Sequence, residues 1–412
     1  MKHPSTARIG LVKHINTATI LRIIREAGPV SRADITKQTG LNAATVSSNV
    51  LPLLELGIVK EIGSGESSGG RKPTLLELAP GSYCVIGVDM GTTGVSTAVT
   101  DLGANMIAEV RLPFGEGSGP DEVLDTIEAS IQQVLDQPGI SPDQVLGIGI
   151  GFHGLVNTEE GVSLFAPAFG WENIPVRERF ASRFDLPVFI DNDVRAMALG
   201  EKWFGQAVQV TNFIFVNVGT GIGSGIYVNG ELLRGSHYGA GEIGHITVAD
   251  NGERCFCGKY GCLSTIASGP ALEERMRRRI QAGTASLLTQ MTEGRLPEIT
   301  GKLIHEAALL GDEPARRLLD ETGRYLGHAV SILVNLLNPE LVIVGGGVAA
   351  SGDLLFKGMH EAIQEKSLRN NVKGMAIRPT AFGGKAGIIG AATLVLQEIF
   401  SAPHLFTLKQ ES

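Results

Sequence analysis

The sequence lacks any apolar segment long enough to cross a membrane. Its longest apolar stretches, such as residues 341–350, fall well short of the ~20 residues that a membrane span needs. The first ten residues contain neither an apolar run nor a cleavage site, so the sequence predicts a cytoplasmic protein with no membrane partner. Aromatic residues make up only 5% of the chain, whereas glycine occurs 54 times. This composition is typical of α/β folds, which use glycine in tight turns between strands and helices.

Cysteine is also scarce, and its placement is informative. Three of the four cysteines, Cys255, Cys257 and Cys262, lie within eight positions. In a reducing compartment such a cluster indicates metal binding rather than disulfides. With His245 it supplies three thiolates and one imidazole, the ligand set of a closed structural Zn²⁺ site, although three unrelated buried thiols remain the alternative. Cys84 lies in an apolar stretch and is interpreted as a small core residue.

Charge is divided unevenly along the 412 residues, a length that suggests two or three folding units. Residues 1–80 carry ten Lys/Arg and six Asp/Glu, a net charge of +4. The whole chain has a net charge of −8, so residues 81–412 carry −12. A basic head on an acidic body favours a nucleic-acid-binding module joined to a second domain, although chance variation would give the same pattern.

The basic head has the pattern of a helix-turn-helix. Apolar spacing predicts a helix over residues 16–26, and Ser31 with Asp34 forms a capping box that opens a second helix ending at Gly40. Asn42 then caps a third helix, in which Pro52 predicts a kink or an early end. Two helices joined through a glycine match the arrangement whose second helix enters the major groove of DNA.

The third helix and the segment after it carry the groups expected to contact DNA. Strands predicted at 58–62 and 74–78 flank a glycine-rich wing suited to the minor groove. The side chains expected to contact bases or phosphates are Arg32, Asn42, Thr45, Ser47, Ser48, Arg71 and Lys72. By pattern alone, a module that binds a protein partner remains the alternative.

In the body, three predicted strands each run into a glycine-rich turn: 84–89, 213–218 and 341–344. Asp89 followed by Gly and Thr is typical of sites that hold Mg²⁺ and nucleotide phosphates, although an ordinary β-hairpin can read the same way. The pattern predicts two related βββαβα lobes facing a cleft. The residues interpreted as nucleotide-loop remnants are Asp89, Gly91, Thr93, Gly219, Gly221 and Gly346.

A second polar group follows the strand predicted at 188–191. Asp191, Asn192 and Asp193 place two carboxylates and an amide at a strand end, a combination that recognises sugar hydroxyls. Asp191 has an alternative reading, as the cap of the following helix.

These segments resemble one family. SRADITKQTGLNAATVS, LLELGIVKE and SSGGRKPTLLEL are similar to the winged-helix head of the ROK family repressors, particularly the xylose-repressor branch. Residues 219–245 and CFCGKYGCL (255–263) resemble the ROK sugar-kinase-like domain, and the likeness covers essentially all of 81–400. The resemblance implies an α/β protein with a winged helix-turn-helix at 1–80 and a two-lobed actin-like ATPase (ribonuclease H-like) sugar-kinase fold at 81–400. The expected lobes are 81–205 with helix 387–400, and 206–386.

The resemblance also assigns roles to residues. It implies that Asn192, Asp193, Glu242 and His245 bind sugar hydroxyls, and that residues 169–173 close over the sugar with Trp171 as an apolar wall. Removing zinc is then expected to loosen the loop that carries His245 beside the sugar.

No catalytic residue is expected, although Asp193 matches the general base of the family kinases. Three departures argue against turnover. Thr92 replaces a glycine of the phosphate loop, Ser264 replaces a glutamate that touches sugar, and Val194-Arg195 replaces Ala-Asn.

The preferred hypothesis is a repressor that binds double-stranded operator DNA as a homodimer or higher homo-oligomer and responds to a sugar. The first alternative is an ATP-dependent sugar kinase with a DNA-binding appendage. The second is a sensor that binds a protein partner in place of a free sugar. The sequence does not identify the sugar.

Overall fold

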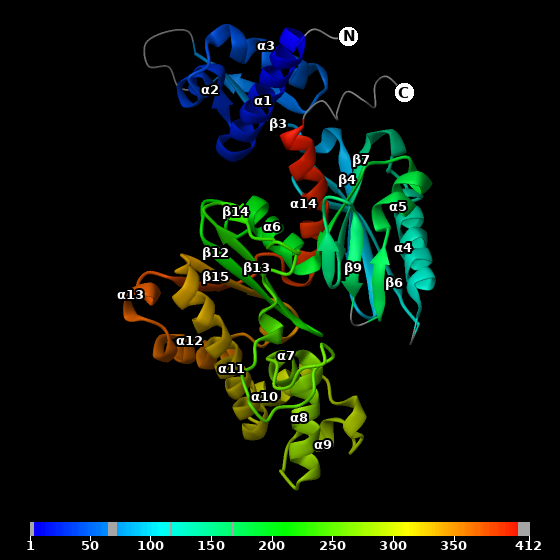
Figure 1. Ribbon diagram of the computed structural model, residues 1–412, viewed down its shortest axis with the longest axis vertical. Coiled ribbons are helices and arrows are strands. Elements are labelled where there is room, and N and C mark those ends of the chain that lie inside the picture. Colours follow the sequence, from blue (N-terminus) through cyan, green and yellow to red (C-terminus); the bar gives the residue numbers. More distant parts are fainter. Residues whose placement is uncertain (1–3, 65–71, 116–117, 167–168, 403–412) are drawn as a thin grey trace.

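The computed structural model describes residues 4–402 except 65–71, 116–117 and 167–168. A small, mainly helical head lies above two α/β lobes (Figure 1). Within the described ranges no helix combines the length and the apolar character that a membrane crossing requires.

The head contains three helices and a small antiparallel sheet, as the sequence predicts for a winged helix-turn-helix. Its elements are α1 (Pro4–Ala27), β1 (Val30–Ser31), α2 (Arg32–Thr39), α3 (Ala43–Glu55), β2 (Val59–Ser64) and β3 (Thr74–Leu78), with strand order β1-β3-β2. The predicted capping box is present, since Ser31 accepts from the Asp34 N–H at 3.1 Å and Asp34 accepts from the Ser31 N–H at 3.1 Å. Gly40 then ends α2 in the left-handed conformation, with φ 71°.

Helix α3 continues past Pro52 to Glu55, so the expected early end is wrong. Proline removes one hydrogen bond, to the carbonyl four residues earlier. That residue, Ser48, is exposed, so water can satisfy its carbonyl. The turn after Pro52 is held in place because Leu53 is buried in the core of the head.

The first lobe is built on a five-stranded sheet of order β11-β7-β4-β5-β6. Its strands are β4 (Cys84–Met90), β5 (Gly94–Asp101), β6 (Met106–Pro113), β7 (Val145–Phe152) and β11 (Val188–Asn192). A smaller sheet contains β8 (Leu155–Asn157), β9 (Val162–Ala166) and β10 (Trp171–Ile174). The helices are α4 (Pro120–Leu135), α5 (Val176–Phe184) and α6 (Asp193–Phe204). The apolar face of α4 covers the main sheet through Val123, Ile127 and Ile131.

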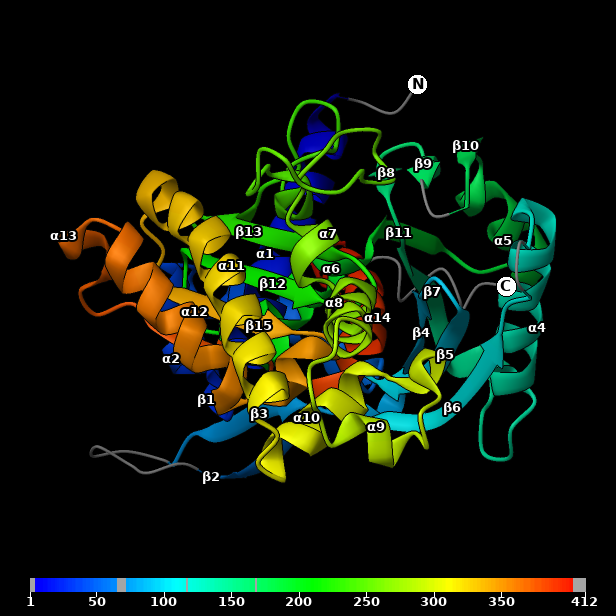
Figure 2. The ribbon, with the colours of Figure 1, turned by 90° about the horizontal axis from the view of Figure 1, so that it is seen from below.

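The second lobe repeats this plan with strand order β14-β13-β12-β15-β16. Its strands are β12 (Phe213–Val218), β13 (Ile222–Val228), β14 (Glu231–Leu232), β15 (Leu341–Gly345) and β16 (Ala376–Pro379). Its helices are α7 (Ser264–Ala267), α8 (Gly269–Gln281), α9 (Leu288–Met291), α10 (Gly301–Leu309), α11 (Glu313–Leu337), α12 (Asp353–Lys366) and α13 (Arg369–Val372). Figure 2 shows α11 and α12 lying across the β12–β15 sheet, with which they share an apolar core.

In each lobe the first strand pairs antiparallel with the second and parallel with the fourth. The two sheets therefore have the same topology, which confirms the prediction of two related lobes.

Helix α14 (Ala386–Ser401) connects the three parts of the molecule. It begins where the two lobes meet and extends up to the head (Figure 1). Its last turn, with Ile399 and Phe400, belongs to the same buried apolar cluster as Leu21 and Ile24 of α1. The core of the head is therefore continuous with the upper part of the first lobe.

Candidate functional site

The predicted loop after β4 lies beside the first turn of α14. The Gly91 N–H donates to the Gly94 carbonyl at 3.0 Å and closes a tight turn. The Asp89 carboxylate is so close to α14 that a Cβ on Gly387 would lie 2.1 Å from its Oδ2. Burial, together with the negative charge of Asp193, raises the pKa of Asp89 to about 7. Asp89 and Asp193, 104 positions apart in the sequence, therefore act on each other electrostatically.

The glycine turns of the second lobe are also tightly packed. The Gly219 N–H donates to the Gly221 carbonyl at 2.9 Å. Gly346 has φ 91°, and a Cβ there would lie 2.4 Å from the carbonyl oxygen of Val218. A side chain at position 346 would be strained both by this conformation and by this contact. The structure thus places the turns after β12 and β15 side by side.

The glycine-rich turns of the two lobes contact each other directly. Thr92 Oγ1 donates to Thr220 Oγ1 at 3.2 Å, linking the turn after β4 to the turn after β12. Thr93, the next residue, is exposed, and its carbonyl accepts from the Phe114 N–H at 2.9 Å. Thr92 therefore links the two glycine-rich turns across the lobes.

The predicted sugar-binding residues of the first lobe gather at the start of α6. Asn192 caps this helix by accepting from the Val194 and Arg195 N–H groups, and its amide donates to Asp193 Oδ1 at 2.9 Å. Asp193 Oδ2 lies 3.9 Å from Nδ1 of His153, which directly follows β7. Burial alone would lower the pKa of His153, but its hydrogen bond with Asp193 and the charges of Asp193 and Glu242 raise it overall.

Asp191 does not cap α6, because Asn192 takes that position, so the alternative reading of Asp191 is wrong. Its side chain is only 1% exposed and accepts from Arg195 Nε at 2.6 Å. Arg234 of the second lobe lies 3.3 Å from the other oxygen of the same carboxylate. Asp191 therefore joins the two lobes through its ion pair with the partly exposed Arg234.

Trp171 does not form the expected exposed wall, because its ring is 2% exposed in the core of the first lobe. In β10 its position pairs with Ala166, and its ring packs 6.1 Å from Phe152. The ring of Phe169 packs on the ring of Trp171, with ring centroids 4.6 Å apart. It also makes an edge-to-face contact with the His153 ring, with centroids 6.5 Å apart. Phe169 is therefore an aromatic ring that packs against His153.

Glu242 and His245 come from the second lobe. The negative charge of Asp193 and burial raise the pKa of Glu242, with burial the larger cause, while Arg195 and His153 oppose the rise. His245 Nε2 lies 3.9 Å from Glu242 Oε2. The two lobes thus bring Asp193, His153 and Glu242 into one electrostatic group.

The predicted metal-binding residues are also brought together. The ligand atoms of His245, Cys255, Cys257 and Cys262 all lie within 4.8 Å of one another. His245 Nδ1 is 3.5 Å from Cys255 Sγ, and Cys257 Sγ is 3.7 Å from Cys262 Sγ. His245 therefore turns one ring nitrogen to the thiols and the other toward Glu242.

The loop that carries these cysteines depends on two glycines. Gly258 and Gly261 have φ 87° and 70°, and a Cβ on Gly261 would lie 1.8 Å from the carbonyl oxygen of Ala249. These glycines allow the chain to turn back on itself between Cys257 and Cys262. Cys84 is buried in β4, far along the chain from the cluster.

In the head, the predicted DNA-contacting residues lie at the start of α3. Asn42 caps the helix by accepting from the Thr45 N–H at 2.8 Å, so its carbonyl oxygen is already used. Asn42, Ser47 and Ser48 are exposed, and Thr45 is partly exposed. The Ser48 hydroxyl donates to the Thr45 carbonyl at 3.0 Å.

The predicted basic contacts differ in their surroundings. Arg32 at the start of α2 is paired with Glu61 of β2 at 2.8 Å. Lys72 is exposed, just before β3, and Arg71 lies outside the described residues. On the wing side of the head, Lys72 is therefore accessible to solvent, whereas Arg32 is engaged in an ion pair with Glu61.

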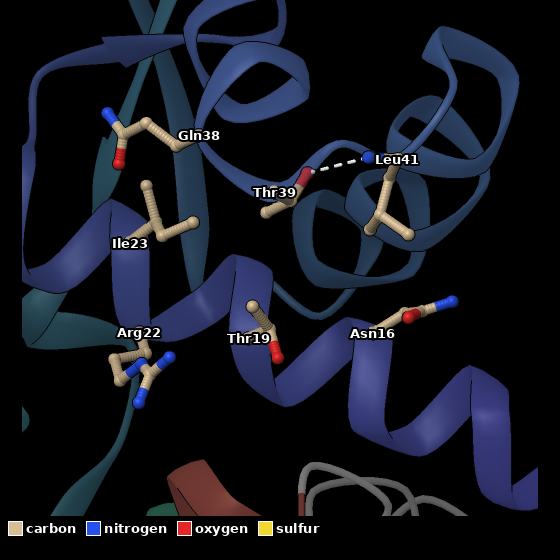
Figure 3. Close-up of a pocket in the computed structure, with 7 residues that line it drawn as sticks. All are labelled: Asn16, Thr19, Arg22, Ile23, Gln38, Thr39 and Leu41. Carbon is tan, nitrogen blue, oxygen red and sulfur yellow. Dashed lines mark hydrogen bonds between the residues drawn. The ribbon is translucent and has the colours of Figure 1, made fainter.

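A hollow of about 460 Å³ separates α1 from α2 in the head (Figure 3). It is lined by Asn16, Thr19, Arg22, Ile23, Gln38, Thr39 and Leu41. Thr39 Oγ1 accepts from the Leu41 N–H at 3.2 Å and fixes the turn into α3. None of the predicted site residues lines this hollow.

Sequence reasoning missed the site residues that only the fold brings in. His153 directly follows β7, and the rule that ligands gather at the carboxyl ends of parallel strands would have found it. Phe169, by contrast, lay within the predicted closing segment but was passed over for the larger Trp171. No sequence signal pointed to the pairing of Arg234 with Asp191.

Similar proteins include both repressors and kinases. Residues 85–398 match the ROK family. The xylose repressor of Caldicellulosiruptor bescii is 33% identical over 394 residues, which are 96% of this chain and 98% of that protein. The crystal structure of a ROK family transcriptional regulator, a homologue of the E. coli MLC protein, gives a TM-score of 0.84 at 31% identity and covers 97% of this chain and 98% of its own. A ROK family glucokinase from Streptomyces griseus, in complex with glucose and AMPPNP, gives a TM-score of 0.70 at 32% identity. The alignment covers 76% of this chain and 99% of the glucokinase.

Proposed function

Because the chain belongs to the ROK family, we propose that it is a DNA-binding repressor of carbohydrate-utilisation genes whose affinity for its operator changes when a sugar binds. One observation carries this proposal. The glucokinase aligns over almost its whole length but matches only 76% of this chain. The regulator matches 97% of this chain. The likeness to regulators therefore extends over the DNA-binding head as well as the sensor domain.

The head would bind duplex DNA with α3 in the major groove. Its exposed polar residues Asn42, Ser47 and Ser48 suit base edges and phosphates, and the wing with Arg71 and Lys72 suits the minor groove. A homodimer would place two such heads on a palindromic operator, with half-sites one helical turn or a multiple apart.

The sugar would bind between the lobes. Asp193 and Glu242 offer carboxylates from opposite lobes, and Asn192 and His245 lie beside them. We assign the apolar wall to Phe169 instead of Trp171, because Phe169 is the ring that contacts His153. A sugar that draws on both lobes changes their relative position, which is the physical basis for a response.

The four-residue cluster would hold Zn²⁺. Three thiolates and an imidazole within 4.8 Å fit a tetrahedral structural site. Zinc would stabilise the loop that carries His245, and the Glu242 carboxylate would orient the imidazole.

We also propose that the sensor does not phosphorylate its sugar. The Thr92–Thr220 contact fills the phosphate-loop position, and Arg195, which replaces an asparagine of the kinases, is used in the ion pair with Asp191. The competing function, an ATP-dependent sugar kinase with a DNA-binding appendage, is favoured by the Asp193–His153 pair and by the glucokinase likeness.

A single set of measurements separates these functions. The purified full-length chain should bind the DNA upstream of its own gene, with an affinity that falls steeply as salt rises. D-xylose or D-glucose, or another sugar of a pentose and hexose panel, should change that affinity. Absence of salt-sensitive binding would contradict the DNA-binding function. ADP release with ATP and any of these sugars, abolished in Asp193→Asn, would establish the kinase instead.

A further inference from the structure

Helix α6 extends from the proposed sugar site to the head. Asp193 is its first residue, and Trp203 and Phe204 lie in its last turn. Twelve residues of α-helix span about 18 Å. A rigid element of this length can transmit a displacement at one end to the other.

At the sugar end, Arg195 ties α6 to both lobes. Its side chain is 2% exposed and donates to Asp191 at 2.6 Å and to the Val156 carbonyl at 3.3 Å, both in the first lobe. It also donates to the Tyr238 carbonyl of the second lobe at 2.5 Å. Tyr238 lies four positions before Glu242. A shift of the loop that carries both residues therefore moves α6 through the hydrogen bond to Arg195.

In its middle, α6 is fixed to α14. Glu201 is fully buried, and its carboxylate accepts from the Thr380 hydroxyl at 2.5 Å and the Ala381 N–H at 2.9 Å, just before α14. A Cβ on Gly390 of α14 would lie 2.3 Å from the Ala196 carbonyl oxygen, so the two helices touch through their backbones. Such close packing makes α6 and α14 move together.

At the head end, both helices meet α1. The Arg25 guanidinium lies 3.6 Å from the centroid of the Trp203 ring, and Phe400 of α14 packs edge-on against that ring at 5.5 Å. Arg25 is 15% exposed, and a cation over an indole face is attracted more strongly when it is desolvated. Burial lowers the pKa of Arg25, in agreement with this setting.

We infer that α6 couples the sugar site to the head, and that the Arg25–Trp203 contact is the point at which sugar binding changes the orientation of the winged helix. The inference rests on the function proposed above and adds the residues that transmit the signal. A movement of the second lobe displaces α6 through the hydrogen bond between Arg195 and the Tyr238 carbonyl. The displaced helix then moves α1 through the contact between Trp203 and Arg25. The coupling is reciprocal, so DNA must change sugar affinity by the same factor.

The first test breaks the contact at the head. Arg25→Gln and Trp203→Leu are made in the full-length chain, and affinity for the upstream DNA is measured with and without saturating D-xylose or D-glucose, whichever the wild type binds. We expect sugar affinity to stay within about 2-fold, since both residues lie a helix length from the sugar. A wild-type sugar effect on DNA affinity of roughly 5- to 150-fold should fall to about 2-fold or less.

Arg183→Gln is the matched control, because Arg183 also lies over an aromatic ring, that of Phe184 at 5.3 Å, but on α5. It should keep the full wild-type sugar effect. An undiminished sugar effect in both Arg25→Gln and Trp203→Leu would overturn the inference while leaving the repressor function intact.

The second test needs no sugar. The chain has two tryptophans, so Trp171→Phe leaves Trp203 as the sole indole. In that background, Arg195→Gln should shift the emission of Trp203 and change DNA affinity at least about 3-fold, and Arg195→Lys should partly restore both. Unchanged Trp203 emission in a folded Arg195→Gln protein would refute the coupling. Failure of the wild type to bind DNA would instead refute the proposed function, and the emission test would still decide on α6.

Discussion

The proposed sugar side and the proposed nucleotide side of the interlobe region use their polar residues differently. On the sugar side, Asp193, His153 and Glu242 converge from two lobes, and the negative charge of Asp193 contributes to raising the pKa of both His153 and Glu242. On the nucleotide side, Thr92 and Thr220 satisfy each other across the lobes. Groups that would bind a sugar remain directed at a common point, whereas groups that would face a phosphate are hydrogen-bonded together. The difference shows that related loops at one lobe boundary can leave some polar groups without a mutual hydrogen bond while others bond to each other, and it is consistent with the proposed sensor without turnover.

The largest expected effect comes from the sugar side. Asp193→Asn should lower sugar affinity by about 100-fold, because hydrogen bonds to a charged group contribute about 1.5–3 kcal/mol each and a carboxylate can take two hydroxyls. Calorimetry with D-xylose and D-glucose measures this. Asp143→Asn, at an exposed position, is the control and should bind normally. Equal sugar affinity in Asp193→Asn and wild type would contradict the assignment of Asp193 to the sugar site.

Metal loss should weaken the same side indirectly. Cys262→Ser, or chelation of the wild type, should lower Tm by about 5 °C or more and sugar affinity by about 10-fold, since His245 joins the metal cluster to Glu242. Metal analysis by a chromogenic chelator should find one Zn²⁺ per wild-type chain. A wild type that is purified without metal, and whose Tm and sugar affinity are unchanged by chelation and by Cys262→Ser, would show that the cluster is only a group of thiols.

The nucleotide side should respond in the opposite direction. Thr92→Gly removes the contact with Thr220 and opens the phosphate loop, so Mg-ATP should raise the Tm of the variant by about 2 °C while leaving that of the wild type unchanged. Thr220→Ser keeps a hydroxyl and should behave like the wild type. If Mg-ATP stabilises wild type and Thr92→Gly equally, the nucleotide side is open and the two sides do not differ.

The smallest effect is a pH dependence of stability. Because the pKa of Asp89 is raised to about 7, the folded protein holds a proton that the unfolded chain loses near pH 4. This carboxyl therefore costs stability progressively as pH rises from about 4 through 7. Relative to wild type, Asp89→Asn should gain about 1 kcal/mol in unfolding free energy between pH 6 and pH 7.

Denaturant unfolding at the two pH values tests this prediction. The exposed Asp143→Asn again serves as the control and should track the wild type. A parallel pH profile for Asp89→Asn would mean that Asp89 is solvated on an open nucleotide side.

Features that depend on neighbours in the chain could be predicted. The capping box of Ser31 and Asp34, the cap at Asn42 and the strands that run into glycine turns are all local. The metal cluster was also predictable, because three of its four members lie within eight positions. Pro52 was misjudged because the loss of one local hydrogen bond was outweighed by burial of Leu53 against other elements.

Features that depend on distant segments could not be predicted. A tryptophan in a closing segment suits a sugar wall by its chemistry, and only the pairing of β10 with β9 buries Trp171. The sequence offers Asp191 as a sugar ligand or as a helix cap, and only the fold supplies its partner Arg234 from the second lobe. The Arg25–Trp203 contact joins residues 178 positions apart, which no local pattern reports.

The sequence by itself determined the class of the protein: a basic helical head, a duplicated α/β body and a cysteine-rich loop, since periodicity, caps and ligand spacing are properties of short segments. The tertiary structure decided which polar groups are available and which are engaged. A carboxylate, hydroxyl or guanidinium has the same chemistry at any position in a chain, and its use depends on the partner that folding brings within hydrogen-bonding distance.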